Sequence, residues 1–292
     1  MAAFEVPEVD YTQYTNRQLV AVPLALLLVA LAILGGWYVA TGAPVTPGID
    51  FTGGSEITVQ TTASSGEVVD AFPIEPSSVQ RVQGASGAGN QFIVTFPPTE
   101  TDLTGAAESL PSAGGDVVRG YSDVSPSFAS ETQRLALIGI AIAFTGMSIL
   151  AFLLFRTFVP SLAIVGSAFS DIVVPLAVMN VLGIKLSLGT VAGLLMLIGY
   201  SVDSDILLTN HVLRRSGDFY ESVRSAMTTG VTMTVTSIAA MAVMTLSAYF
   251  FGISLMTSIG LVLVVGLTTD LINTYMFNVA LLRWYKYDGV AR

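Results

Sequence analysis

The sequence predicts an α-helical polytopic membrane protein with six transmembrane helices and one α+β domain that lies outside the membrane, between the first and second helices. Three observations carry this prediction. Of the 292 residues, 52% are hydrophobic and only 11% are charged, whereas a soluble domain is typically about 25% charged. Six apolar stretches reach the length of about 20 residues that a helix needs to cross the hydrocarbon. One long polar block separates the first stretch from the other five.

The first apolar stretch, 19–40, is too long and too uninterrupted for the core of a signal peptide, so we expect a retained transmembrane helix. The remaining five stretches are expected within a membrane part that spans 134–282. They are 135–155, 161–182, 187–208, 231–251 and 255–282. Between the fourth and fifth stretches, a loop near 210–230 contains a segment, 213–227, that we expect to form a helix on the inner membrane surface.

Basic residues near the helix ends predict the orientation, because cytoplasmic loops carry an excess of Lys and Arg. One side of the membrane would hold Arg17, Arg156, Arg214, Arg215, Arg224, Arg283, Lys286 and Arg292. This side is therefore expected to be cytoplasmic. It would include the N-terminal segment 1–18, the loop near 210–230 and the tail 283–292. The expected location is the cell membrane, with both termini in the cytoplasm.

The polar block, 41–133, contains eleven acidic and only two basic residues, a net charge of −9 that equals the net charge of the whole chain. Alternating and amphipathic patterns predict the order strand, helix, strand, strand, helix, strand, which is typical of a ferredoxin-like domain. The expected strands are 55–62, 78–83, 91–96 and 115–121, and the expected helices are 67–72 and 101–110, with Thr101 as the N-cap. A hairpin tip is expected at 84–89.

The composition also excludes several function classes. The chain has no cysteine and one histidine, His211, so disulfides, thiolate chemistry and a cysteine- or histidine-based metal site are not expected. No catalytic constellation, metal site or cofactor is predicted, and we expect no enzyme. The net charge of −9 argues against a nucleic-acid partner. An acid-rich, lysine-poor composition suggests a salt-adapted source.

Four acidic residues fall within or near the expected spans: Asp171, Asp203, Asp205 and Asp270. A carboxylate at the centre of a transmembrane helix costs about 2.5–3.5 kcal/mol on insertion scales, so a role in ion transfer is the default hypothesis. Neutral carboxyls held by neighbouring hydroxyls are the alternative. Asp203 and Asp205 lie about 200° apart around their helix, so they cannot share one face.

Polar residues with helical spacing accompany these acids. Asp270 and Asn273 belong to one stripe on the sixth span, and Thr232 and Thr236 form another on the fifth. With Ser201 and Ser204 of the fourth span, they predict a polar seam between helices four, five and six. The seam is interpreted either as an ion path or as hydrogen bonds that hold the helices together.

Three segments carry a resemblance to a known family, and the resemblance extends over the whole chain. These are Gly48-Ile49-Asp50-Phe51-Thr52-Gly53-Gly54, Val124-Ser125-Pro126-Ser127-Phe128 and Gly199-Tyr200-Ser201-Val202-Asp203-Ser204-Asp205-Ile206-Leu207-Leu208. The chain resembles the SecF type, in its archaeal form, of the SecD/SecF family of protein-export membrane proteins in the RND superfamily. In the first motif, Gly53 and Gly54 permit left-handed backbone after Asp50 and Phe51.

The resemblance implies an accessory subunit that pairs with SecD and acts beside a SecYEG-type channel on a translocating polypeptide, within membrane lipid. It also implies that a flow of protons or sodium ions drives the export. Asp203 is the residue carried over as the helix-four acid. The chain departs from the bacterial pattern, which tends to place an acid where Ser204 stands and an arginine near Thr232.

Other functions remain open at the level of sequence. The chain could be half of an RND-type small-molecule transporter, or a scaffold that stabilises the translocase without moving ions. An intramembrane protease built on Asp203 and Asp270 is a weaker alternative, because the surrounding protease motifs are absent. The sequence leaves open the coupling ion, the stoichiometry with SecD and the amplitude of any motion of the outer domain.

Overall fold

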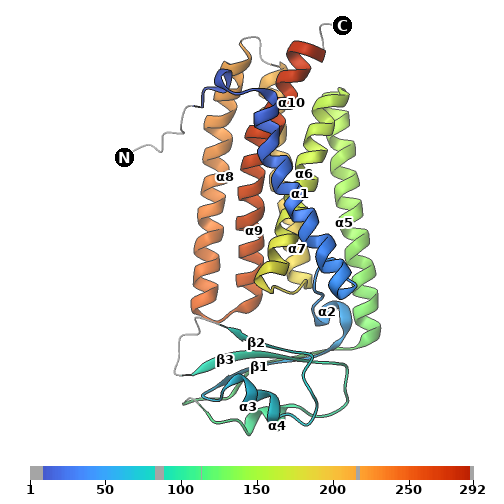
Figure 1. The fold of residues 1–292 in the computed structure, drawn as a ribbon, viewed down its shortest axis with the longest axis vertical. Coiled ribbons are helices and arrows are strands. Elements are labelled where there is room, and N and C mark those ends of the chain that lie inside the picture. The colour runs from blue at the N-terminus through green and yellow to red at the C-terminus, as the bar shows by residue number, and fades with distance from the viewer. Residues whose placement is uncertain (1–8, 83–88, 113, 215–217, 290–292) are drawn as a thin grey trace.

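Six long helices stand side by side, and a small sheet lies across one end of the bundle (Figure 1). The computed structural model describes residues 9–82, 89–112, 114–214 and 218–289. The predicted hairpin tip at 84–89 falls outside the described residues except for Gly89. The first and last segments of the described chain lie at the end of the bundle opposite the sheet (Figure 1).

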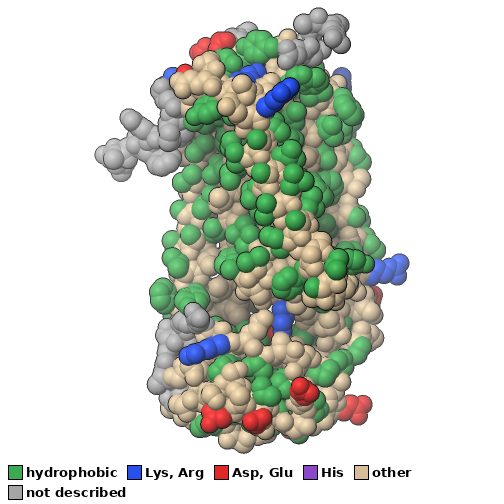
Figure 2. Space-filling model, in the orientation of Figure 1, with side chains coloured by type: hydrophobic (Ala, Val, Ile, Leu, Met, Phe, Trp, Pro, Cys, Tyr) green, Lys and Arg blue, Asp and Glu red, His purple; other side chains and the backbone are tan. Residues whose placement is uncertain are grey.

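The six predicted spans are confirmed as helices that are long and apolar enough to cross a membrane. They are α1 (Asn16–Thr41), α5 (Pro126–Phe155), α6 (Phe158–Leu182), α7 (Leu188–Arg214), α8 (Phe219–Phe250) and a final rod that begins with α9 (Ser254–Ile272). A short 3-10 turn, η1 (Tyr11–Gln13), precedes α1. Hydrophobic side chains cover the visible flank of the bundle, and acidic side chains are seen at the sheet end and at the opposite end of the bundle (Figure 2).

The final rod changes its helical type halfway along. After α9 the chain forms a π-helical turn, η2 (Asn273–Asn278), and then continues as α10 (Val279–Trp284) and a second π-turn, η3 (Tyr285–Gly289). π-turns are rare and often occur at functional sites, because they change which side chains and backbone groups face a neighbouring helix. Here η2 lies in the interior, with Asn273, Thr274, Tyr275 and Asn278 all buried.

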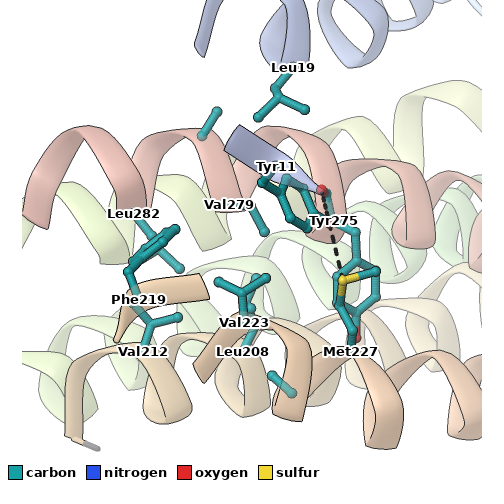
Figure 3. Packing of buried hydrophobic residues seen from close by; sticks show 12 residues of the cluster. Tyr11, Leu19, Leu208, Val212, Phe219, Val223, Met227, Tyr275, Val279 and Leu282 are labelled. Atoms are coloured by element: carbon teal, nitrogen blue, oxygen red, sulfur yellow. Dashed lines mark hydrogen bonds between the residues drawn. The ribbon is translucent and has the colours of Figure 1, made fainter. Parts of the chain in front are cut away.

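The predicted inner-surface helix at 213–227 is wrong. Helix α8 begins at Phe219, capped by the Asp218 carboxylate, and continues without a break to Phe250. The physical reason is burial: Phe219, Val223 and Met227 belong to a hydrophobic core rather than to a surface that faces lipid headgroups. Figure 3 shows Val223 and Met227 packed beneath Tyr11 and Tyr275.

The sheet is four-stranded and entirely antiparallel, in the spatial order β2-β3-β1-β4. Its strands are β1 (Gly54–Thr61), β2 (Ser78–Val82), β3 (Asn90–Phe96) and β4 (Val118–Val124). Helices α3 (Ser65–Asp70) and α4 (Thr104–Glu108) cover the face that points away from the bundle (Figure 1). Ile57, Val59, Phe92, Val94 and Phe96 form the core beneath them.

The order of strands and helices follows the sequence prediction, but the second helix of this domain is shorter than expected. Helix α4 begins at Thr104 instead of 101, and Thr101 is not its N-cap. The Asp102 carboxylate accepts a hydrogen bond from the Thr104 amide at 2.9 Å. This local bond holds the preceding residues in a turn, which delays the start of the helix.

Candidate functional site

Three of the four acids in the spans meet inside the bundle. Asp171 of α6, Asp205 of α7 and Asp270 of α9 are each no more than 1% exposed. Asp203, the residue favoured by the sequence, is instead exposed on the outer surface of α7. The angular separation of Asp203 and Asp205 was predictable, but which of them faces inward depends on how α7 packs.

Hydroxyl and amide side chains surround each buried carboxyl. Asp171 accepts hydrogen bonds from the Ser201 hydroxyl at 2.5 Å and from the Asn273 amide at 2.7 Å. The Ser204 hydroxyl lies 2.9 and 3.0 Å from the two oxygens of Asp270. The three acids, which come from three different helices, therefore share one layer of polar side chains.

Thr274 of η2 connects two of the carboxyls. Its hydroxyl is 2.7 Å from Asp205 Oδ1 and 3.3 Å from Asp270 Oδ1. The Asn278 amide nitrogen also donates to Asp205 Oδ1. Because a hydroxyl can donate one proton while accepting another, this arrangement can pass a proton between Asp270 and Asp205. We call the set Asp171, Asp205, Asp270, Ser201, Ser204, Asn273, Thr274 and Asn278 the carboxylate cluster.

No positive charge compensates the carboxylate cluster within the part of the chain that the structure describes. No ion pair joins Asp171, Asp205 or Asp270 to a Lys, Arg or His side chain there. Buried charges are normally paired with an opposite charge or with a metal ion. The chemistry of these groups allows them to bind protons or a cation.

The predicted seam is only partly right. Ser201, Ser204 and Asn273 belong to the carboxylate cluster, but Thr232 and Thr236 of α8 are exposed and do not reach it. Each of these threonines donates to the backbone carbonyl four residues earlier in its own helix, at 2.7 Å. A threonine in an apolar helix can satisfy its hydroxyl in this way without a partner helix. The polar layer therefore joins α6, α7 and the final rod, not α8.

A hydrophobic core closes the side of η2 that faces the chain ends. The Tyr11 hydroxyl lies 2.9 Å from the Tyr275 carbonyl and 3.2 Å from Met227 Sδ (Figure 3). Helix α8 approaches η2 closely at Gly230, where a Cβ would lie 2.1 Å from the Tyr275 hydroxyl. This packing separates the carboxylate cluster from the end of the bundle where the described chain begins and ends.

The glycine pair after α1 has the geometry that the sequence suggested. Gly53 and Gly54 have φ angles of +74° and +115°. A Cβ on Gly54 would lie 2.2 Å from the Phe96 carbonyl oxygen, and a Cβ on Gly53 would lie 3.0 Å from Pro126 Cα. Only glycine allows this passage of the chain between β3 and the start of α5.

Asp50 of the same motif connects the sheet end to α7. Its carboxylate accepts a hydrogen bond at 2.8 Å from the amide of Leu188, the first residue of α7. Phe51 anchors this segment, since it is only 7% exposed. A carboxylate at a helix N-terminus satisfies a free amide and interacts favourably with the helix dipole. The motif thus holds the N-terminus of the helix that carries Asp203 and Asp205.

Lys185, in the turn between α6 and α7, was not among the candidate residues predicted from the sequence. Its ammonium group donates to Ser78 and Thr95 of the sheet, both at 2.7 Å. Burial lowers the pKa of Lys185, and the nearby Glu56 opposes that shift. Burial likewise raises the pKa of Glu56, while Lys185 acts in the opposite direction. These contacts span about 90–107 residues of sequence, so no local pattern could reveal them.

The chain is similar to known protein-export membrane proteins over its whole length. Residues 110–288 match the family "Protein export membrane protein SecD/SecF, C-terminal", and residues 39–64 match "SecD/SecF GG Motif". Relatives named protein-export membrane protein SecF are 63% identical in Haloferax volcanii and 62% identical in Haloquadratum walsbyi, each with full coverage of both chains. One from Pyrococcus furiosus is 36% identical and covers 97% of this chain and 99% of its own.

A solved structure shares the fold. The crystal structure of SecDF, a translocon-associated membrane protein from Thermus thermophilus, superimposes with a TM-score of 0.74 at 20% sequence identity. The match covers 96% of this chain but only 39% of that chain. More than half of the Thermus protein therefore has no counterpart here.

Proposed function

Because the chain belongs to the SecD/SecF family of protein-export membrane proteins, as a SecF protein and accessory subunit of the Sec pathway, we propose that it couples ion flow across the membrane to polypeptide export. One observation carries the coupling part of this proposal: three buried carboxyls, connected through hydroxyl groups, have no counter-charge among the described residues. Such groups are costly in a membrane protein and are usually functional.

We place the sheet outside the cell membrane, as a ferredoxin-like domain of residues 41–133, and both termini in the cytoplasm. The distribution of basic residues supports this orientation, because most of them lie near the ends of the helices opposite the sheet. The segments 1–18 and 283–292 and the turn between α7 and α8 would then face the cytoplasm.

The proposed partner is SecD, beside a SecYEG-type channel and in contact with the translocating polypeptide and membrane lipid. The exposed face of α7 supports a partner subunit at this position. Leu188, Met196, Tyr200 and Asp203 follow one another at helical spacing and are all exposed in the single chain. A carboxyl that faced lipid tails directly would be costly, so a polar partner surface is expected against Asp203.

The contacts at the sheet end supply a route from the carboxylate cluster to the outer domain. Asp50 holds the N-terminus of α7, and Lys185 holds the adjoining turn to β2 and β3. We propose that a change of charge at Asp205 shifts α7 along its axis and thereby moves the sheet. This motion would assist the emerging polypeptide.

The test is export of a Sec-dependent secreted reporter, measured by pulse–chase in cells whose own copy of the protein is replaced by a variant. Asp205→Asn is expected to slow export at normal protein levels, because the variant cannot gain and lose charge. Thr232→Ala is the matched control, since this exposed threonine bonds only to its own helix. Undiminished export with Asp205→Asn would favour the passive scaffold. Loss of the protein without an export defect, together with no co-purifying SecD, would favour a small-molecule transporter.

A further inference from the structure

One member of the hydrophobic core beside η2 comes from outside the long helices. The other buried members lie on α1, α7, α8 or the final rod, whereas Tyr11 belongs to the short turn η1. On α7 this core begins at Leu208, three residues beyond Asp205, so it forms an apolar layer between the carboxylate cluster and the end of the bundle. Tyr11 is only 5% exposed and points into this layer (Figure 3). A side chain from a short turn therefore completes the layer that the helices form.

Tyr11 reaches the backbone directly beside the carboxylate cluster. Its hydroxyl donates to the Tyr275 carbonyl at 2.9 Å and lies 3.2 Å from Met227 Sδ. Tyr275 belongs to η2 and follows Thr274, whose hydroxyl connects two of the buried carboxyls. The phenol ring thus fills the space between α8 and the π-turn, and its hydroxyl holds it there.

The turn η1 is a self-contained unit that does not depend on α1. The Asp10 carboxylate accepts hydrogen bonds from the Thr12 amide at 3.0 Å, the Thr12 hydroxyl at 2.5 Å and the Gln13 side-chain amide at 2.9 Å. Helix α1 has its own N-terminal cap, a capping box between Thr15 and Gln18. Because the two elements satisfy their hydrogen bonds separately, η1 can move away without unwinding the start of α1.

Arg283 of α10 fastens η1 to the bundle. Its Nε donates to the Asn16 side-chain oxygen, and its two terminal nitrogens donate to the carbonyls of Tyr11 and Tyr14, both at 2.9 Å. All three acceptors are neutral oxygen atoms, and the bond to Tyr14 is exposed. Water can replace such bonds at a surface, where the net free energy of each one is small. The attachment is therefore specific but reversible.

We propose that η1 is a plug that controls the access of water to the carboxylate cluster from the end of the bundle opposite the sheet. Tyr11 is the closing side chain and Arg283 is the clasp. With the plug seated, the apolar layer is continuous and excludes water from that end. Release of the clasp withdraws Tyr11 and opens the layer beside Tyr275. The plug is inferred from its own contacts, and only a consequence for export would rest on the proposed function.

The test uses the rate of thiol labelling in membranes that contain the full-length chain with its natural partners. The chain has no cysteine, so Thr274→Cys places a single reporter thiol in the polar layer, at a residue that is 0% exposed. Membrane fragments open on both faces are treated with a membrane-impermeant methanethiosulfonate, which reacts with thiolates in water. In the reporter chain, Tyr11→Ala is expected to raise the labelling rate by at least about tenfold. Tyr14→Ala is the matched control, because this tyrosine is exposed and lies outside the core.

Two further variants separate a plug from a general loosening of the core. Leu282→Ala truncates a buried side chain of the same core but leaves η1 in place, so it is expected to lower the Tm without faster labelling. Arg283→Gln removes the clasp without making a cavity in that layer and is expected to speed labelling. If Tyr11→Ala does not accumulate, Arg283→Gln is held to the same criterion.

Two results would overturn the plug: labelling that stays at the reporter's rate in both Tyr11→Ala and Arg283→Gln, or an equal acceleration in Leu282→Ala. The labelling rate reports water access and not export, so the two proposals fail separately. Undiminished export with Asp205→Asn would refute the ion-coupled function and leave the plug intact. An unchanged labelling rate would refute the plug and leave the ion-coupled function intact.

Discussion

Gly54→Ala tests the tight passage of the chain at the glycine pair. The new Cβ would lie 2.2 Å from the Phe96 carbonyl oxygen, well inside any normal contact, and the residue would keep a φ of +115°. Phe96 is the last residue of β3, paired in the sheet register with Ser55 of β1. The clash is therefore between two backbone segments, and it can be relieved only if β1 and β3 separate at this end.

The magnitude follows from two contributions. A side chain forced into a packed site costs about 1–3 kcal/mol, and an L-residue with positive φ costs about 1–2 kcal/mol. Their sum of about 2–5 kcal/mol would lower the Tm of a cooperative unit of about 80 residues by roughly 10 °C or more. The Tm of Gly53→Ala, whose Cβ would lie 3.0 Å from Pro126 Cα, is expected to lie between those of Gly54→Ala and the wild type.

The assay is thermal unfolding of the purified chain, followed by circular dichroism. Gly66→Ala is the matched control, because it lies in α3 of the same domain and its Cβ would meet nothing within 4 Å. A helical glycine replaced by alanine gains about 0.5–1 kcal/mol, so this variant is expected to unfold at or above the wild-type Tm. A Gly54→Ala chain as stable as the wild type would refute the reasoning.

Three further predictions concern other contacts of the fold. Asp50→Ala removes the carboxylate at the N-terminus of α7 and is expected to cost about 1 kcal/mol in thermal unfolding; an unchanged Tm would show that the cap contributes nothing. Burial raises the pKa of Glu56, so its contribution to stability is lost as the pH rises above 4.5. As the pH rises above 4.5, the wild type is expected to lose stability that Glu56→Gln does not lose, so the Tm of the variant should rise relative to that of the wild type. A Tm difference that does not change with pH would contradict the raised pKa. Gly230→Ala places a Cβ 2.1 Å from the Tyr275 hydroxyl and is expected to lower the Tm. Tyr275→Phe removes that hydroxyl, which is buried and has no hydrogen-bond partner among the described residues, so the double variant is expected to regain part of the lost Tm. Strictly additive Tm changes would exclude that contact as the cause.

The membrane spans were predictable because hydropathy and length act locally. Each helix from α1 to the final rod contains its predicted apolar stretch, or nearly all of it. The start of α8 was missed because Phe219, Val223 and Met227 follow an arginine-containing loop, and only their burial against Tyr11 and Tyr275 shows that they belong to the bundle. Basic residues near a helix end indicate the membrane surface, but they do not show whether neighbouring apolar residues are buried in the helix bundle.

The candidate site was predictable in its residue types but not in its membership. The sequence identified all four acids and placed Asp203 and Asp205 on opposite faces, yet it favoured Asp203, which the structure leaves exposed. The stripe of Thr232 and Thr236 had the same periodicity as Asp270 and Thr274, but threonines can bond to their own backbone, and these do. Periodicity finds the faces of a helix, and packing decides which face has a partner.

The most direct measurement of the central claim is an infrared difference spectrum of the purified chain, recorded as the pH is changed. If a buried carboxyl gains and loses its proton, the wild type will show a pH-dependent carboxyl stretching band that is lost in Asp205→Asn and retained in Asp203→Asn. The absence of any such band in the folded wild type, or a band that survives unchanged in Asp205→Asn, would contradict the account.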